Sequence, residues 1–456
     1  MSQAVLSVDQ ARHGSRDKLK ASIGAAVGTC VENYDFLAYG TASALYFGTY
    51  FFPESDPLTG TLLSFATLGV GFAMRPLGGV IGGYLGDRYG RKPVLVGALI
   101  VMGLATFLIG LLPTYQTVGS LAPILLVTVR VIQGLAFGAE WGGAVLMAYE
   151  HAPWKQRGRY SAIPTAGNPA GVFLANVAFL ISVQFDSGIA WRIPFLLSAV
   201  LVIAGLVIRA RVSESPEFEL TKARHEIAKN PIGQVFRRDW RNLLRLIGLR
   251  LVESVGFYVV VTFVLSYLTT NDESDRNIAL TGLVLAALLG VPASLLWGRL
   301  TDKVGRKPVY LAGSVLTLAF GFPLFLFLNT GAPLLIVLVY LIGLPLIHDM
   351  LAGTQGAWFS ELFSTKTRSS GASMGYQFAA AISGFVPFAA AALTAAVDWP
   401  GVAALYCAAG VVGLVAVAVT PETWGPQERA KVDAFIGGEI SATEATAHVT
   451  TNEAAR

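Results

Sequence analysis

The first long apolar segment of the chain carries two acids whose spacing suits proton binding. Glu32 and Asp35 are three residues apart, so a helix would place them on one face. An ionisable side chain at the middle of a bilayer costs at least about 2.5 to 3.5 kcal/mol, so it should face a partner or water. Two acids in one site can share a proton. We predict that this pair takes up and releases a proton, with Asp35 the deeper of the two; the alternative is that one acid neutralises a structural arginine.

Two arginines occupy other apolar segments. Arg75 and Arg130 stay charged, because a guanidinium group does not lose its proton in proteins, and each presents a planar fork that suits carboxylates. We predict that both face a water-filled cavity that binds an organic anion, although Arg130 could instead pair with Asp35 or Glu140 for assembly alone. Further polar and aromatic residues are predicted to contact the ligand of this cavity: Gln133, Tyr34, Tyr39, Tyr258, Glu253, Arg250, His348, Gln355 and Gln377.

Charged residues recur in later apolar segments. Arg250 and Glu253 share a helix face at a spacing of three residues, so we expect them to pair with each other. His348 and Asp349 are adjacent, and a helix would point them to different faces. A lone buried histidine is more often a hydrogen-bonded structural group, so contact of His348 with a ligand or a proton is the second of two hypotheses.

A charged, glycine-rich segment occurs twice. The stretch from Gly83 to Pro93, GYLGDRYGRKP, has a near copy from Gly298 to Pro308, GRLTDKVGRKP, at an offset of 298 − 83 = 215 residues. Two weaker repeats have similar offsets. Glu150 with Arg157 is repeated as Glu361 with Arg368, and Ser213-Glu214-Ser215 is repeated as Pro421-Glu422-Thr423. Such an offset indicates two homologous halves of roughly 200 residues.

Each copy places an acid, bases and glycines between two apolar runs, which is typical of a short loop at a membrane surface. A role in fixing the orientation of the chain in the membrane would explain the basic residues. It would not explain why an acid and glycines occur at the same positions of both copies. We therefore predict that charge networks at these loops lock the two halves together on one side. The residues predicted to control this gate are Asp87, Arg88, Arg91, Lys92, Glu150, Arg157, Asp302, Arg306, Glu361 and Arg368.

The composition is that of a membrane protein. Hydrophobic residues make up 54% of the 456 residues and charged residues 14%, compared with about 25% charged in soluble domains. Apolar runs of about twenty residues recur, each long enough to cross a hydrocarbon core about 30 Å thick, and their continuity indicates helices. We predict an all-α polytopic membrane protein with twelve transmembrane helices, at approximately 22–47, 58–86, 94–112, 119–148, 162–184, 191–209, 242–268, 278–300, 308–328, 333–360, 370–396 and 400–420.

The predicted organisation is two six-helix bundles. Most of the 33 Lys and Arg residues fall in segments on one side of these crossings, which places both termini in the cytoplasm. The polar linker between the bundles could carry a short surface helix. The predicted parts are a cytoplasmic N-terminal segment 1–21, a first bundle 22–209, a linker 210–241, a second bundle 242–420 and a cytoplasmic tail 421–456.

These motifs resemble those of known transporters. The duplicated loop and Pro421-Glu422-Thr423 are similar to signatures of the major facilitator superfamily. ENYDF at 32–36, RVIQG at 130–134, GAEWGG at 138–143 and WRIPF at 191–195 resemble the metabolite–proton symporter family, although Asn33 stands where that family usually has tryptophan. That family includes carriers for shikimate, α-ketoglutarate, citrate, and proline or betaine. The resemblance implies alternating access between two bundles, a substrate site at the midplane and proton coupling.

The expected function is import of a small organic anion, shikimate-like or another carboxylate, together with protons. We expect a monomer in the bacterial inner membrane, with no cofactor, metal or nucleic acid. An enzyme is not expected, because the sequence contains no nucleophile–base motif, metal cluster or phosphate loop. The alternatives are proton-coupled uptake of a proline-like or betaine-like zwitterion, proton-driven drug efflux, and a membrane sensor that moves nothing. The leading hypothesis requires Glu32, Asp35, Arg75 and Arg130 to surround a wet central cavity.

Overall fold

The chain folds into helices. The computed structural model describes residues 15–89, 91–138, 145–146, 148–150, 152–185, 187–210, 231–271, 275–364 and 367–436, and all regular structure within them is helical. Ten helices there are long and apolar enough to cross a membrane, and Val96–Leu111 is a shorter apolar helix. The predicted crossing 22–47 is helical too, although its polar residues keep it out of that set. The all-α polytopic fold is confirmed, whereas the count of twelve stays a prediction.

The helices of the first half follow the predicted order, and several are interrupted. Pro76 lies beside the interruption between α4 and α5, where proline removes a backbone donor. α10 and α11 are separated at Ala166, and Pro164 and Pro169 flank this interruption. The elements are α2 (Ser15–Ala42), η1 (Ser43–Phe47), α3 (Gly48–Phe51), α4 (Pro57–Ala73), α5 (Arg75–Tyr89), α6 (Arg91–Leu111), α7 (Tyr115–Val118), α8 (Leu121–Gly138), η2 (Trp154–Gln156), α10 (Arg157–Thr165), α11 (Gly167–Ser182), α12 (Ser187–Ala190) and α13 (Ile193–Ala210).

The second half repeats this pattern. The predicted linker contains a short helix, α15, and the predicted tail contains α25; residues 211–230 and 437–456 lie outside the described part of the chain. The elements are α15 (Pro231–Arg238), α16 (Trp240–Tyr258), η3 (Val259–Phe263), α17 (Val264–Asn271), α18 (Asp275–Val304), α19 (Arg306–Leu328), α20 (Pro333–Leu341), η4 (Ile342–His348), α21 (Asp349–Glu361), α22 (Arg368–Ser383), α23 (Val386–Val397), α24 (Trp399–Val419) and α25 (Pro426–Ile436).

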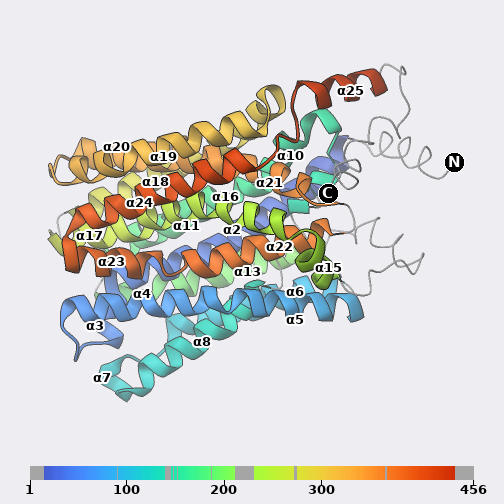
Figure 1. Cartoon of the computed structure of the whole chain (residues 1–456). Helices are drawn as coiled ribbons and strands as arrows, with labels where there is room; N and C mark the ends of the chain where they lie inside the picture. Colours follow the sequence, from blue (N-terminus) through green and yellow to red (C-terminus); the bar gives the residue numbers. More distant parts are fainter. Residues whose placement is uncertain are drawn as a thin grey trace.

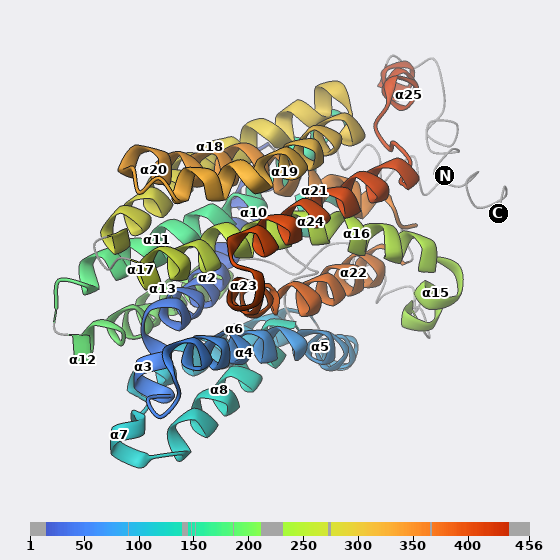
Figure 2. The same ribbon diagram turned by 60° about the vertical axis from the view of Figure 1, so that its left-hand side comes forward.

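The long helices run roughly side by side along one axis (Figures 1 and 2). The short helices α15 and α25 lie at one end, which we call the α25 end, and α3 and α7 lie at the opposite end. The two halves contact each other along two seams. In one seam α10 and α11 pack against α18 and α21, and in the other α4 and α5 pack against α22 and α23. A site between the halves is therefore bounded by helices from both repeats.

The duplication is visible in the backbone geometry as well as in the sequence. The π-helical segments η1 and η3 begin 259 − 43 = 216 residues apart, which is close to the offset of the duplicated loop. A third π-helical segment, η4, contains Pro345 and ends at His348. Such segments widen a helix by one residue per turn and often lie at functional sites. Tyr258 directly precedes η3, and His348 is the last residue of η4.

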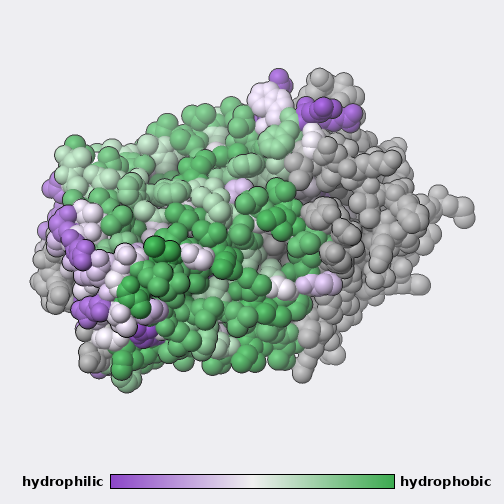
Figure 3. Space-filling model, turned by 90° about the horizontal axis from the view of Figure 1, so that it is seen from below, coloured by the Kyte–Doolittle hydropathy of each residue, from purple (hydrophilic) through white to green (hydrophobic). Residues whose placement is uncertain are grey.

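Apolar side chains cover the middle of the face shown in Figure 3 and form an apolar belt there. The large apolar side chains of the chain that are more than 60% exposed include Val200, Ile203, Leu296 and Leu334. Apolar patches of this extent do not occur on ordinary soluble proteins. The belt therefore faces lipid, as expected for a membrane protein.

Acids cap helices at the end opposite α25. The Thr59 backbone N–H donates to Asp56 Oδ1 at 3.1 Å at the start of α4, and the Trp399 N–H donates to Asp398 Oδ1 at 2.7 Å at the start of α24. Hydrogen bonds from the hydroxyl and backbone N–H of Thr59 lower the pKa of the exposed Asp56 carboxyl group. These two acids thus satisfy N–H groups at helix N-termini that have no partner within the helix.

Candidate functional site

A central cavity lies between the two halves. Its volume of about 70 Å³ is enough for several water molecules. The first half contributes Asn33, Phe36, Arg75 and Asn168 to the wall, and the second half contributes most of the hydrogen-bonding groups. The polar wall residues of the second half are Arg250, Glu253, Ser254, Tyr258, Thr262, Gln355, Ser360, Ser369, Ser373 and Tyr376.

Arg75 is the cation that the first half presents to this cavity. Its guanidinium carbon lies 3.9 Å from the ring centroid of Phe36, 3.7 Å from that of Phe72 and 3.8 Å from that of Phe137. Among the described residues, no carboxylate forms an ion pair with Arg75, and its Nε has no hydrogen-bond partner. The aromatic faces stabilise the desolvated cation and hold the fork in place without neutralising it. No sequence pattern indicated this aromatic cage, because aromatic residues are common in apolar helices.

Glycines bring α8 against α4 and α5, and this contact positions Arg75. A Cβ atom on Gly134 would overlap the carbonyl oxygen of Gly71, and a Cβ on Gly138 would overlap that of Arg75 itself. Close backbone approach through small residues is the usual way that membrane helices gain packing energy. The first turn of α5 is thereby pinned to the end of α8, and the Arg75 side chain extends into the space between the halves.

Arg130 lies one layer behind the cavity rather than on its wall. It is fully buried on α8, where its Nη1 contacts Gln133 Oε1, and its guanidinium carbon lies 4.1 Å from the Tyr39 ring centroid and 4.4 Å from that of Phe36. Gln133 Nε2 in turn donates to Thr106 Oγ1 at 2.7 Å. No hydrogen-bond partner reaches Arg130 Nε or Nη2 among the described residues. Arg130 therefore carries unsatisfied donors in a dry layer next to the first acid pair.

Asp35 lies in the same buried layer. Its side chain is fully buried on α2, with the Thr106 hydroxyl, the Arg130 guanidinium and Glu32 as its polar neighbours. Neither carboxyl oxygen has a hydrogen-bond partner of good geometry among the described residues. Glu32 is 3% exposed and shares the helix face of Asp35, as its spacing predicts. The prediction that these ions surround the cavity therefore needs correction: Arg75 reaches the wall, and Glu32, Asp35 and Arg130 lie behind it.

The expected pairing of Arg250 with Glu253 is confirmed. Arg250 Nη1 contacts Glu253 Oε2 across one helical turn, Nη2 donates to the Tyr376 hydroxyl at 2.8 Å, and Nη1 donates to Gln355 Oε1 at 3.2 Å. Gln355 also donates to the Tyr310 hydroxyl at 3.0 Å. This cluster holds the second-half wall of the cavity in a fixed arrangement.

His348 and Asp349 do not point to different faces, contrary to the expectation from their adjacency. His348 Nδ1 lies 2.9 Å from Asp349 Oδ1, and His348 Nε2 lies 2.7 Å from Glu253 Oε1. The cause is local: η4 ends at His348 and α21 begins at Asp349, so the regular spacing of 3.6 residues per turn does not apply across this junction. His348 lies behind Glu253 and Phe257 rather than on the cavity wall.

Other residues predicted to contact the ligand also lie away from the wall. The Tyr34 hydroxyl donates to the carbonyl oxygen of Pro194 at 2.6 Å, and the Tyr39 hydroxyl is hydrogen-bonded to Thr67 Oγ1 at 2.6 Å. Gln377 is buried and has no hydrogen-bond partner among the described residues. Of the predicted ligand contacts, the structure brings five to the cavity: Arg75, Arg250, Glu253, Tyr258 and Gln355.

The second copy of the duplicated loop forms a charge cluster at the α25 end. Arg306 is fully buried and donates to Asp302 Oδ1 at 2.9 Å and to Glu361 Oε1 at 3.1 Å. Asp302 also accepts the backbone N–H groups of Gly158 at 2.7 Å and Arg159 at 2.9 Å. These two bonds join α18 of the second half to the start of α10 of the first half. Asp302, Arg306 and Glu361 thus lie together, as a gate between the halves requires.

Two further predicted gate residues meet at Tyr149, beside this cluster. Arg157 Nη1 donates to the Tyr149 hydroxyl at 3.0 Å, and the Arg368 guanidinium carbon lies 5.3 Å from the Tyr149 ring centroid. Arg368 Nε donates to the carbonyl oxygen of Ser360 at 2.9 Å, and Glu361 and Arg306 are also charged neighbours of Tyr149. Tyr149, which the sequence did not single out, is the residue that the two arginines share. Glu150 is half-buried, and the side chains of Asp87, Arg88, Arg91 and Lys92 lie outside the described residues.

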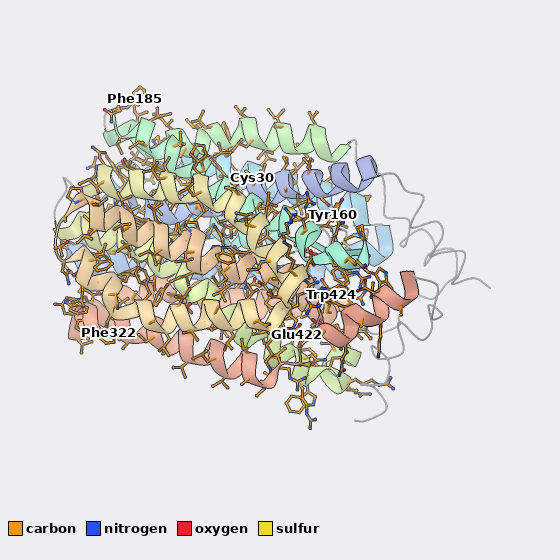
Figure 4. All side chains as sticks on the ribbon, turned by 90° about the horizontal axis from the view of Figure 1, so that it is seen from above. Cys30, Tyr160, Phe185, Phe322, Glu422 and Trp424 are labelled. Carbon is orange, nitrogen blue, oxygen red and sulfur yellow. The ribbon has the colours of Figure 1, made fainter. Side chains whose placement is uncertain are left out.

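Glu422, from the repeated Pro421-Glu422-Thr423 motif, caps the helix that follows the loop. Its Oε1 accepts the Arg306 backbone N–H at 3.0 Å, and its Oε2 accepts that of Lys307 at 2.9 Å. The neighbouring Trp424 donates its indole N–H to the carbonyl oxygen of Asp302 at 2.9 Å. Glu422 and Trp424 lie at the α25 end, away from Phe185 and Phe322 at the other (Figure 4). The motif therefore attaches the polypeptide after α24 to the gate cluster.

Comparisons with known proteins agree with this architecture. The sequence matches the Major Facilitator Superfamily over residues 26–386 and again over residues 293–448. It is 42% identical over 422 residues to the shikimate transporter of Escherichia coli K12, covering 90% of this chain and 94% of that protein. It is 37% identical over 420 residues to the inner membrane metabolite transport protein YhjE of the same organism, covering 89% and 94%. A crystal structure of a D-xylose–proton symporter shares the fold, with a TM-score of 0.67 at 18% identity over 89% of this chain and 98% of that one.

Proposed function

Because this chain belongs to the major facilitator superfamily, we propose that it is a secondary active transporter that imports a small organic anion together with protons. The residues around the cavity support a carboxylate of shikimate-like size as the substrate. A relative with 42% identity over nearly its whole length is named as a shikimate transporter. The inner membrane is the proposed location, with both termini and the α25 end in the cytoplasm.

The observation that carries this proposal is Arg75. A guanidinium group that faces a cavity among three aromatic rings, with no carboxylate of its own among the described residues, is suited to bind the carboxylate of a ligand. Hydroxyl and amide groups of Tyr258, Gln355 and Asn33 line the same space and can bind hydroxyl groups of a substrate. A cationic drug would instead need an acid in the position of Arg75.

Asp35 is the proposed proton carrier, and Glu32 assists it. A buried carboxylate without hydrogen bonds costs several kcal/mol, and taking up a proton removes this cost. Arg130 is a neighbour of Asp35 and stacks on the Phe36 ring, which also contacts Arg75. Binding of an anion at Arg75 changes the field at Arg130 and Asp35, which lie in a medium of low dielectric constant. In this way substrate binding and proton binding are linked.

Movement of the two halves about the cavity would expose the site alternately to either side. The seam of α10 with α18 closes the α25 end while Asp302 holds the N–H groups of Gly158 and Arg159. Breaking these bonds would let that end open. The prediction of gating by the duplicated loop is thus retained for Asp302, Arg306 and Glu361.

Transport in proteoliposomes tests the proposal. Purified protein should take up shikimate, and each uptake should alkalinise the outer medium; anion entry without proton entry would refute symport. The Asp35→Asn variant should lose uphill accumulation while it retains exchange of internal for external shikimate. Glu54→Gln, which changes an exposed acid of an outer loop, is the matched control and should behave as the wild type. If Asp35→Asn accumulated shikimate as the wild type does, Asp35 would have no part in coupling.

A further inference from the structure

A second group of buried titratable residues lies in the other half, with Glu253 on the cavity wall and His348 and Asp349 behind it. The imidazole of His348 lies between two carboxyl groups, with Nδ1 2.9 Å from Asp349 Oδ1 and Nε2 2.7 Å from Glu253 Oε1. All three side chains are less than 5% exposed. The other oxygen of Glu253, Oε2, contacts Arg250 Nη1. The proposed proton carrier Asp35 belongs to the first half, so this group is separate from it.

The two contacts of His348 determine how many protons the group holds. Neutral imidazole carries hydrogen on only one nitrogen, and the other nitrogen presents a lone pair. With carboxylates beside both nitrogens, one contact would then place a lone pair against an anionic oxygen. A proton on the imidazole or on one of the carboxyl groups makes both contacts attractive, although no well-aligned hydrogen bond reaches Nε2 in this structure. The arrangement therefore holds one proton more than neutral histidine with two carboxylates.

This extra proton also balances the local charge. Arg250 carries one positive charge, and Glu253 and Asp349 carry two negative charges when ionised. With neutral His348 the group has one net negative charge, and one added proton brings it to zero. The described residues that approach Asp349 from α18 and α11 are uncharged: Ser294, Gly290 and Pro169. No further charged side chain competes for the proton among the described residues of these elements.

The group connects the cavity to the seam between the halves. Glu253 and Phe257 line the cavity, and the Phe257 ring centroid lies 4.8 Å from that of His348. At the other side, a Cβ on Gly290 of α18 would lie 2.6 Å from Asp349 Oδ2 and 2.8 Å from the Cβ of Pro169 of α11. Asp349 is therefore packed where the first half crosses the second. A rearrangement of this seam would change the surroundings of Asp349.

We propose that Glu253, His348 and Asp349 form a second proton-carrying site, which takes one proton from the cavity through Glu253 and releases it on the other side of the membrane. The inference rests on the proposed proton-coupled import and adds to it a count of two protons, one on Asp35 and one on this triad. The same proton enters and leaves, so no other reactant is needed. Movement of α11 against α18 couples the release to the change of access.

Two protons make the import of a monoanion electrogenic, because each cycle then moves one net positive charge inward. With a pH difference of one unit and no membrane potential, two protons allow about 100-fold accumulation and one proton about tenfold. A charge that moves down the membrane potential gains about 2.3 kcal/mol per 100 mV, so about 60 mV corresponds to a factor of about ten. With two protons per monoanion this potential therefore raises the accumulation about tenfold further. With one proton no net charge moves, and the potential has no effect.

Shikimate, a monoanion at neutral pH, is the probe, and its accumulation in proteoliposomes at clamped potential is the measurement. The wild type and the Glu54→Gln variant should accumulate shikimate about 100-fold at a pH difference of one unit, and this accumulation should increase with the membrane potential. His348→Gln should reach about tenfold, lose the response to potential and keep shikimate exchange. Exchange of shikimate verifies that the variant is folded. If His348→Gln shows no exchange, the isosteric Asp349→Asn variant replaces it in the test, with the same expected accumulation and the same loss of response to potential.

The outcomes separate this inference from the proposed function. A wild type that brings protons in with shikimate but does not respond to potential would overturn the second site and leave symport intact. A folded His348→Gln or Asp349→Asn variant that keeps about 100-fold accumulation would overturn the second site as well. A wild type that takes up shikimate without protons would overturn both proposals.

Discussion

Asp302 offers the sharpest test of the gate, because its carboxylate is bonded to backbone groups of the opposite half. Its two oxygens accept the N–H groups of Gly158 at 2.7 Å and Arg159 at 2.9 Å, and the side chain is only 8% exposed. Asp302→Asn keeps the size and one acceptor oxygen, so about one charge-assisted hydrogen bond is lost. Such a bond contributes about 1.5 to 3 kcal/mol, which corresponds to about 10- to 150-fold in the equilibrium between closed and open α25 ends.

The assay is the rate at which a membrane-impermeant maleimide, added from the α25 side, labels a cysteine in the cavity. Ser369→Cys places the probe on the cavity wall, in a background where the two native cysteines are serine. The rate should rise by about 10- to 150-fold in Asp302→Asn, because labelling follows the open fraction. Asp433→Asn is the matched control: its pairing with Lys155 also joins α25 to the first half, but both side chains are more than 50% exposed. Exposed pairs contribute about 0 to 1 kcal/mol, so its rate should rise by at most about fivefold.

Equal rates in Asp302→Asn and the wild type would refute the reasoning. They would mean that the bonds to α10 do not hold the α25 end closed. A rise in Asp433→Asn as large as that in Asp302→Asn would locate the gate at α25 instead. Either result would leave the fold unaffected and remove the duplicated loop from the gating mechanism.

Three further predictions follow from single contacts. Gly134→Ala should lower the free energy of unfolding by about 1 to 3 kcal/mol in thermal or denaturant melts, because the new methyl group overlaps the Gly71 carbonyl; Gly97→Ala, where nothing lies within 4 Å, should have little effect. Arg75→Lys should raise the KM for shikimate uptake about tenfold, because an ammonium loses the fork and its stacking in the aromatic cage; an unchanged KM would place the carboxylate elsewhere. Glu422→Ala should cost about 0.5 to 2 kcal/mol in the same melts by uncapping α19, and equal melts would show that the cap is redundant.

The order of the elements could be predicted from sequence because it rests on strong, local signals. Long apolar runs indicate membrane helices, and the repeat at an offset of 215 residues predicts two halves; η1 and η3 follow nearly the same offset. The helix breaks were harder to predict. Gly167 and Pro169 are residue types that interrupt helices and a break occurs beside them, whereas the π-helical segments have no comparable sequence pattern. The junction after η4 is the reason that adjacency misled the prediction for His348 and Asp349.

The rotation of each helix was the main quantity that the sequence could not supply. Helices with apolar residues on every side have no pattern that distinguishes the cavity face from a packed face. Arg75 and Arg130 therefore looked equivalent, but one reaches the wall and the other lies behind Phe36 and Tyr39. The contacts that separate them come from glycines on α4, α5 and α8, whose effect depends on which helix lies opposite.

The buried charges suggest why the carrier would move substrate and protons together. Within the crossings, the described residues that are charged and buried are three arginines, Arg75, Arg130 and Arg250, and four acids, Glu32, Asp35, Glu253 and Asp349. With neutral His348 they leave one net negative charge in the empty carrier. A bound monoanion adds a second negative charge, and two protons then restore neutrality. Because net charge is costly in a closed, low-dielectric interior, the loaded carrier should change access most readily with both protons bound. The empty carrier then returns without these protons and with its one negative charge, so this return is the step on which a membrane potential acts; fewer protons should slow the loaded carrier rather than prevent anion binding at Arg75.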